Sequence, residues 1–165
     1  MHPRHSKPLD LVRIHINDLW HLMESIVRYI IVAFLMVCSS AFAGDYNLGD
    51  LTVTKSFSYP TNGRSGAGYF TLTNDGMTDM LMAVTADFPR VMIHESLMQD
   101  GVMTMQHRMR VEVPGQGQIE FAPGGYHVMF MGLNEDWAEG DEIEASLQFK
   151  NAGTLDIKFV VIARP

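Results

Sequence analysis

The sequence predicts an all-β fold, a β-sandwich or barrel, that follows an N-terminal leader. From Leu51 onward, short runs rich in Val, Ile, Thr, Phe and Tyr alternate with clusters of Gly, Pro, Asn and Asp, and no long amphipathic helix is evident. The 165 residues, of which 47% are hydrophobic, suffice for one domain with a packed core. We therefore expect a single β domain.

Residues 1–43 differ in composition from the rest of the chain and are interpreted as a signal peptide. The apolar run Ile30–Val37 is followed by Ala41 and Ala43, which satisfy the small-x-small rule for signal peptidase. This run is shorter than the roughly 18 apolar residues that a membrane-spanning helix needs. We expect cleavage after Ala43 and a periplasmic domain made of residues 44–165.

Two alternatives concern this leader. Met23 is an alternative start, because residues 1–22 are long for the charged region of a signal peptide and a signal that begins at Met23 has an ordinary length. Cys38 could carry the lipid of a lipoprotein, but Val37 precedes it where such sites usually have a small residue. We favour cleavage over lipidation. The four histidines of residues 1–22 have no regular spacing and are assigned no function.

Residues 44–165 divide into nine candidate strands separated by turn-forming sequences such as Asp100-Gly101 and Pro123-Gly124-Gly125. Many short strands with frequent turn signals are typical of a sandwich or barrel. The loop-like stretch Tyr59–Gly66 could border a site, but we favour a plain connector. The candidate strands are Leu51–Ser58, Gly68–Thr73, Asp79–Ala86, Val91–Met98, Val102–Met109, Gln118–Phe121, His127–Gly132, Glu142–Phe149 and Leu155–Ile162.

Charge and cysteine content exclude several function classes. Residues 44–165 hold eight basic and 16 acidic side chains, a net charge of −8, which argues against nucleic acid or an anionic membrane as partner. The same residues contain no cysteine, so they can form no disulfide and no thiolate metal site, and a blue-copper electron carrier is excluded. No Ser-His-Asp order or paired-carboxylate spacing stands out, and we expect no enzyme.

Methionine and histidine gather between Met92 and Met131, which include all three histidines that follow residue 43. In the predicted strand around Met129, period-two alternation places His127, Met129 and Met131 on one face and apolar or aromatic residues on the other, inward face. Side chains two positions apart on one face begin roughly 7 Å apart, so long Met and His side chains can reach a shared ion.

A second segment, Val102–Met109, repeats this alternation with further thioether and imidazole groups. Imidazole and thioether donors without thiolate or carboxylate favour copper, above all Cu(I), with zinc as the second choice. Methionine also fills irregular gaps in protein cores, and we interpret the scattered methionines in this way. These are Met77, Met80, Met82 and Met92.

The sequence resembles the periplasmic copper chaperones of the PCu(A)C type, whose signature is His, ten residues, Met, 21 residues, His, any residue, Met. Four residues match it at every position: His94, Met105, His127 and Met129. The resemblance covers essentially all of residues 44–165 and implies a cupredoxin-like β-sandwich that binds one exposed Cu(I) through these four. It also implies delivery to a partner, an oxidase subunit or its assembly factor, in assembly of the copper centre of cytochrome c oxidase.

Two departures from the family pattern are visible. Ser96 stands where many members have a methionine, and the chain ends at Pro165 without the Met- and His-rich tail that could hold a second copper. We therefore expect one site. Four soft or borderline ligands lie outside the signature and are interpreted as packing residues or weak secondary contacts: Met103, His107, Met109 and Met131.

Two other functions remain open. Copper sequestration for resistance would use the same ligands, and a non-metal β-sandwich interaction module would use its Met-rich surface for docking. Replacing His94 and His127 separates the module from a copper site, because a docking surface tolerates the change. A copper site should also weaken below about pH 6, since a protonated imidazole cannot bind metal. We expect a monomer.

Overall fold

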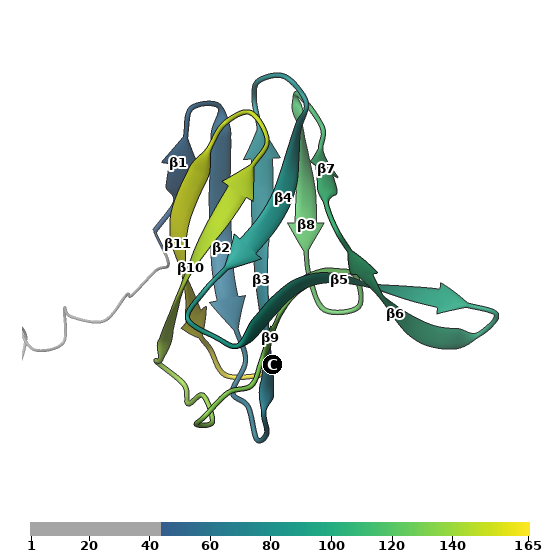
Figure 1. Cartoon of the computed structure of the whole chain (residues 1–165), viewed down its shortest axis with the longest axis vertical. Coiled ribbons are helices and arrows are strands. Elements are labelled where there is room, and N and C mark those ends of the chain that lie inside the picture. The colour runs from purple at the N-terminus through teal and green to yellow at the C-terminus, as the bar shows by residue number, and fades with distance from the viewer. Residues whose placement is uncertain (1–43) are drawn as a thin grey trace, which may run out of the picture. The chain divides into compact units, whose positions relative to one another are not determined.

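The computed structural model describes residues 44–165, so the expectations about the start at Met23 and cleavage after Ala43 lie outside the described residues. The described part is built from strands without a helix (Figure 1), which confirms the all-β prediction, and it has no helix long and apolar enough to cross a membrane. The strands are β1 (Tyr46–Leu48), β2 (Leu51–Ser58), β3 (Ser65–Asn74), β4 (Asp79–Thr85), β5 (Arg90–Gln99), β6 (Val102–Arg108), β7 (Val111–Val113), β8 (Gly117–Phe121), β9 (Tyr126–Met131), β10 (Glu142–Phe149) and β11 (Thr154–Val161).

All nine predicted strands are present, and the sequence missed only β1 and β7. Each missed strand has three residues, too few to show an alternating pattern. β1 pairs with β2, and β7 pairs with β4 and buries Val111 and Val113. Their existence depends on strands that lie elsewhere in the sequence.

The strands form one hydrogen-bonded sheet in the order β6-β5-β9-β8-β3-β2-β11-β10-β4-β7, with β1 beside β2 and an additional pairing of β9 with β3. The sheet folds over a common core. Phe130 of β9 packs edge-on against Phe159 of β11 at 5.6 Å between ring centroids, although these strands are not neighbours in the sheet. This packing across the core is that of a sandwich, as predicted.

Aromatic side chains occupy the centre of the core. Phe70 of β3 and Phe121 of β8 are stacked at 4.2 Å between ring centroids, and both rings are almost completely buried. Strands β10 and β11 alternate buried and more exposed residues, as expected for strands with one face against the core. Burial of each such aromatic ring contributes about 1.5–3 kcal/mol to folding. The core therefore fixes the strands that carry the site.

β3 begins at Ser65 rather than at the predicted Gly68, because its first residues pair with β9 and two glycines let it lie close to the core. A Cβ at Gly66 would overlap the ring of Trp137, and a Cβ at Gly68 would lie 2.7 Å from Cε1 of Phe159. Glycine here allows the strand to pass close beneath two aromatic rings. Both glycines are therefore a packing requirement within the strand.

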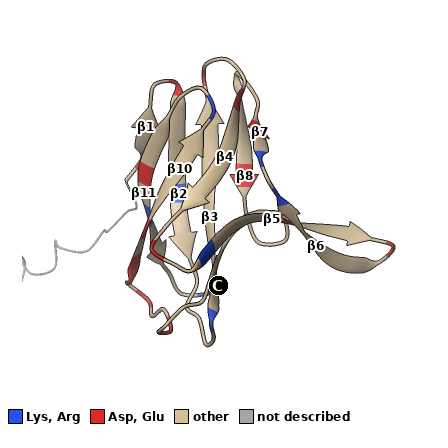
Figure 2. Cartoon of the chain, viewed as in Figure 1, with Lys and Arg blue, Asp and Glu red and all other residues tan. Residues whose placement is uncertain are grey.

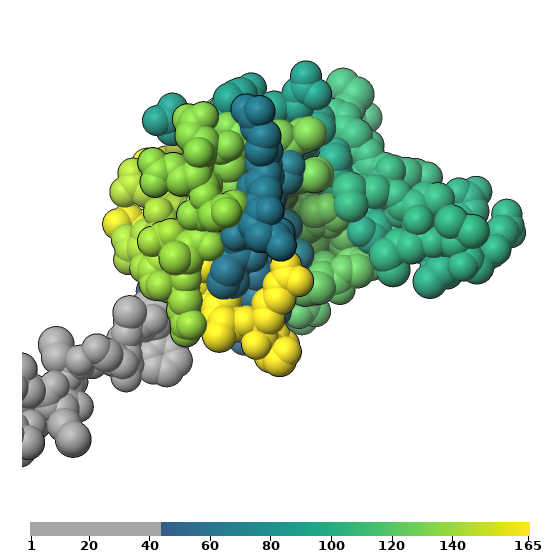
Figure 3. Space-filling model, turned by 90° about the horizontal axis from the view of Figure 1, so that it is seen from below, coloured from purple at the N-terminus to yellow at the C-terminus, as the bar shows by residue number. Residues whose placement is uncertain are grey.

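Strands β5 and β6 form a hairpin that extends beyond the body of the sandwich (Figures 1 and 3). A two-residue turn closes it, with φ of 52° at Asp100 and 78° at Gly101, as the Asp-Gly sequence predicts. Between Ser96 and Gln106, the hairpin carries no charge apart from Asp100 at its tip (Figure 2). β6 lies at the edge of the sheet and pairs with β5 alone.

Candidate metal site

The structure brings the four signature residues to one face of the β6-β5-β9 part of the sheet. His94 lies on β5, Met105 on β6, and His127 and Met129 on β9. In the strand register His94 is opposite His127, and Ser96, two positions further along β5, is opposite Met105. Residues separated by up to 35 positions in the sequence therefore become neighbours.

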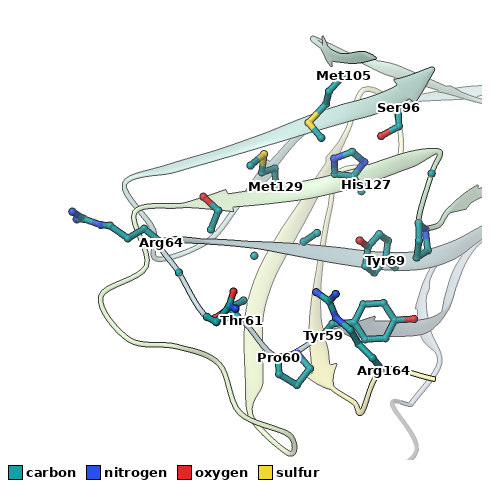
Figure 4. A pocket seen from close by; sticks show the side chains of 17 residues that line it. Tyr59, Pro60, Thr61, Arg64, Tyr69, Ser96, Met105, His127, Met129 and Arg164 are labelled. Atoms are coloured by element: carbon teal, nitrogen blue, oxygen red, sulfur yellow. The ribbon is translucent and has the colours of Figure 1, made fainter. Parts of the chain in front are cut away.

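The donor atoms of these residues face a common space. Nδ1 of His94 lies 3.1 Å from Sδ of Met105. The ring centroids of His94 and His127 are 5.8 Å apart, with the two ring planes perpendicular. Figure 4 shows the thioether groups of Met105 and Met129 pointing toward each other beside the ring of His127. Two imidazoles and two thioethers thus converge from three strands.

His127 is held in a form that can bind a metal. Its side chain is buried, and its Nδ1 donates a hydrogen bond to the carbonyl oxygen of Gly125 at 3.0 Å. Because a carbonyl only accepts hydrogen bonds, the neutral ring has its proton on Nδ1 and its lone pair on Nε2. Alternation placed His127 on the outward face of β9, and its burial arises because β5 and β3 flank this strand.

His94 is favoured in its neutral form. Burial lowers the pKa of His94, and the neighbouring rings of His127 and His107 lower it further. Only a neutral imidazole can donate a lone pair to a metal ion. The position of His94 between two other histidines therefore keeps it ready to act as a ligand at neutral pH.

The site has a buried side and an open side. His127 is 6% exposed, whereas Met105 on the projecting hairpin is 56% exposed. Within residues 44–165, no three His, Cys, Asp or Glu side chains are gathered closely enough to hold a metal ion by themselves. A four-donor site on this face therefore needs the thioethers, and one of them is accessible to another molecule.

An open pocket of about 450 Å³ adjoins Met105, His127 and Met129, and the stretch Tyr59–Gly66 forms one of its walls. This stretch therefore connects two strands and also borders the candidate site. Arg164 lies over the ring of Tyr59, with Cζ 5.5 Å from the centroid, and both line the same pocket (Figure 4). No local pattern in the sequence places them here, because Tyr59 follows β2 and Arg164 follows β11, two paired strands that are distant in the sequence.

Several interpretations of the other methionines are corrected by the structure. Met77 is 90% exposed and Met82 40% exposed, so neither fills the core. Met103 and Met109 are also largely exposed, and Met109 follows the end of β6, so packing does not explain them either. Methionine is common at adaptable binding surfaces as well as in cores, and the Met-rich composition here reflects surface positions as much as core positions.

Comparison with solved structures finds the same fold in PCuAC domains. The apo PCuAC domain from PmoF1 matches with a TM-score of 0.62 and 24% identity over 73% of this chain and all of that chain. The copper-bound PCuAC domain from PmoF2 matches with a TM-score of 0.62 and 22% identity over 73% of this chain and 99% of that chain. This likeness confirms the cupredoxin-like fold.

Sequence comparison finds a curated relative and a family. The relative is the "Putative lipoprotein Lxx21020" of Leifsonia xyli subsp. xyli (strain CTCB07), 29% identical over 83 residues, so the match spans half of this chain and half of that protein. The family model described as "Putative lipoprotein LpqE-like" matches residues 51–161, which include β2 to β11 and all four signature residues. The chain therefore belongs to the LpqE-like family, which is of the PCu(A)C type.

Proposed function

We propose that this protein is an exported copper chaperone that binds one Cu(I) ion through His94, Met105, His127 and Met129 and passes it to a partner. The observation that carries the proposal is the convergence of two imidazoles and two thioethers on one face of three adjacent strands. The 3.1 Å contact between His94 and Met105 brings donors of both kinds together, and the Nε2 lone pair of His127 is available.

The chemistry of the donors supports Cu(I) as the cargo. Soft thioether sulfur prefers the soft Cu(I) ion, whereas Mg²⁺ and Ca²⁺ require oxygen ligands. Two neutral imidazoles and two thioethers bring no negative charge to the ion, so transfer to a thiolate acceptor is favourable. The exposed position of Met105 on the hairpin gives an acceptor direct access to the ion.

The comparisons support the same role. A copper-bound PCuAC domain is among the structures that share this fold, and the family is one of copper-binding chaperones rather than enzymes. Four protein ligands also leave no open position for catalysis. The LpqE-like family and the curated relative are both named as lipoproteins, which supports export. We include cleavage after Ala43 and a periplasmic location in the proposal.

For the partner, we retain the acceptor implied by the resemblance, an oxidase subunit or its assembly factor. Delivery would then serve assembly of the copper centre of cytochrome c oxidase. Transfer from the loaded protein to a cysteine-containing acceptor domain, followed by anaerobic gel filtration, separates delivery from sequestration. A chaperone gives up its Cu(I) within the mixing time, whereas a sequestration protein retains it.

The test of the site is an anaerobic Cu(I) titration of residues 44–165 in competition with a chromophoric chelator. This segment holds every described strand and the whole described core. We expect one Cu(I) per chain, and we expect His127→Ala and Met129→Ala to lower the affinity by about tenfold or more. Met103→Ala is the matched control, because Met103 is exposed on the same hairpin face and lies outside the signature.

Either of two results would contradict the proposal. In the first, Cu(I) remains entirely with the chelator, and in the second, the variants bind it as tightly as the unaltered protein does. The Met-rich hairpin would then be better explained as the docking surface of a non-metal interaction module. Equal losses in Met129→Ala and Met103→Ala would show that the methionines act as an unspecific thioether surface rather than as a defined site.

A further inference from the structure

A third imidazole stands beside the four signature residues, and the signature does not use it. His107 of β6 lies directly opposite His94 of β5, which in turn lies opposite His127 of β9. The ring centroids are 5.9 Å apart from His94 to His107 and 5.8 Å apart from His94 to His127. The three rings form a row across adjacent strands, with His94 in the middle.

The side chains of the two outer histidines differ in how firmly they are held. His127 is buried and its Nδ1 is bonded to Gly125, whereas His107 is exposed on the edge strand. In the described residues, the three rings do not converge on one point for an ion. His107 must therefore turn about its side-chain bonds toward His94 to share one. An exposed side chain can make such a turn without a change in the backbone.

Copper in its two oxidation states prefers different donors. Cu(I) is soft and favours thioether sulfur, whereas Cu(II) favours imidazole nitrogen and oxygen in a square-planar or tetragonal arrangement. Two imidazoles and two thioethers therefore suit the reduced ion and hold the oxidised ion poorly. Three imidazoles and water would supply the donors that Cu(II) prefers. His107 is the one group on this face that adds an imidazole to His94 and His127 within the described residues.

We propose that His107 joins His94 and His127 as the third imidazole ligand of Cu(II). The two ligand sets share His94 and His127. The thioethers of Met105 and Met129 complete the set for Cu(I), and the imidazole of His107 completes the set for Cu(II). The inference rests on the proposed Cu(I) site. It adds Cu(II) as a second form of the bound ion and His107 as the residue that binds this form. It requires no redox step within the protein.

The experiment is a Cu(II) titration of residues 44–165 against glycine as the competing ligand, with electron paramagnetic resonance of the loaded protein. We expect one Cu(II) per chain with nitrogen couplings from three imidazoles. His107→Gln should lower the Cu(II) affinity by about tenfold or more and remove one imidazole from the spectrum. Gln106→Ala is the matched control, since Gln106 is an exposed neighbour on the opposite face of β6, and it should change neither readout.

Cu(I) titrations of the same variants keep this proposal separate from the chaperone proposal. His107→Gln should keep its Cu(I) affinity within about twofold, whereas Met129→Ala should lose Cu(I) and retain Cu(II). The assignment of His107 is overturned if the unaltered protein binds no Cu(II), if His107→Gln binds Cu(II) unchanged, or if it loses both ions in equal proportion. If the unaltered protein does not bind Cu(I), the chaperone proposal is overturned instead.

Discussion

The body of the sandwich and the β5–β6 hairpin differ in the residues they place along their strands. The body buries phenylalanine rings at its centre, whereas the hairpin exposes methionines. The difference arises because the hairpin extends beyond the body of the sandwich (Figures 1 and 3), where the second layer does not cover it. Phe70, Phe121, Phe130 and Phe159 are at most 1% exposed, and Met98, Met103 and Met105 are 67%, 62% and 56% exposed.

This difference divides the candidate site into two halves. His127 and Met129 alternate along β9 with Val128 and Phe130, which are fully buried in the core. Packing of the core therefore fixes two of the four donors. Met105 depends on the hairpin for its position, and a hairpin outside the core can move with little loss of packing. A cargo site that is rigid on one side and adaptable on the other suits both retention and release of the ion.

The largest effect should come from the rigid half. Phe130→Ala removes a ring that contacts Phe88, Trp137 and Phe159, and we expect the free energy of unfolding to fall by about 3–5 kcal/mol. Urea unfolding followed by tryptophan fluorescence measures the change. Met103→Ala on the hairpin should alter the stability by no more than about 0.5 kcal/mol. Similar losses for the two variants would show that the hairpin packs as tightly as the body.

Much of this division follows from the sequence. Alternation separated Val128 and Phe130 from His127 and Met129, and the Asp100-Gly101 turn fixes the hairpin register. That register pairs His94 with His107. The pairing of β5 with β9 joins strands that are distant in the sequence and cannot be read from local patterns. The same limit explains why β1 and β7 were missed.

The second-largest effect should come from a buried carboxylate in the body of the sandwich. Asp79 accepts hydrogen bonds from the backbone N–H groups of Met80, Asn151 and Ala152, at 2.7, 3.0 and 2.9 Å, and so ties β4 to the β10–β11 turn. Burial raises the pKa of this carboxyl, but the hydrogen bonds outweigh burial, and the pKa lies below its usual value. We expect Asp79→Asn to lower the free energy of unfolding by about 1–3 kcal/mol at pH 7.

The pH dependence of this effect has a definite sign. A folded-state pKa below the unfolded one stabilises the protein above the unfolded pKa, near 4, and this contribution is lost as the pH falls through the folded pKa. The stabilities of the unaltered protein and Asp79→Asn should therefore converge in acid. Urea unfolding at a series of pH values from 7 to about 2.5 measures the convergence. A difference that stays constant over this range would show that shape, not charge, determines the role of Asp79.

The smallest effect should come from the base of the hairpin. Arg108 Nε donates a hydrogen bond to Glu95 Oε2 at 2.6 Å across β5 and β6, and both side chains are partly exposed. Arg108→Ala should lower the global stability by no more than about 1 kcal/mol, because an ion pair in contact with water contributes little. We expect faster amide hydrogen exchange in β6 with no change in β9.

The matched control for Arg108→Ala is Lys158→Ala, which breaks an exposed ion pair with Glu142 on the body and should leave exchange in β6 unchanged. If amide hydrogen exchange in Arg108→Ala instead becomes faster in both β6 and β9, the hairpin and the body open as one unit. Met105 would then be held as firmly as Met129. The release of copper would in that case have to depend on ligand exchange with the acceptor, because no movement of the hairpin could loosen the thioether of Met105.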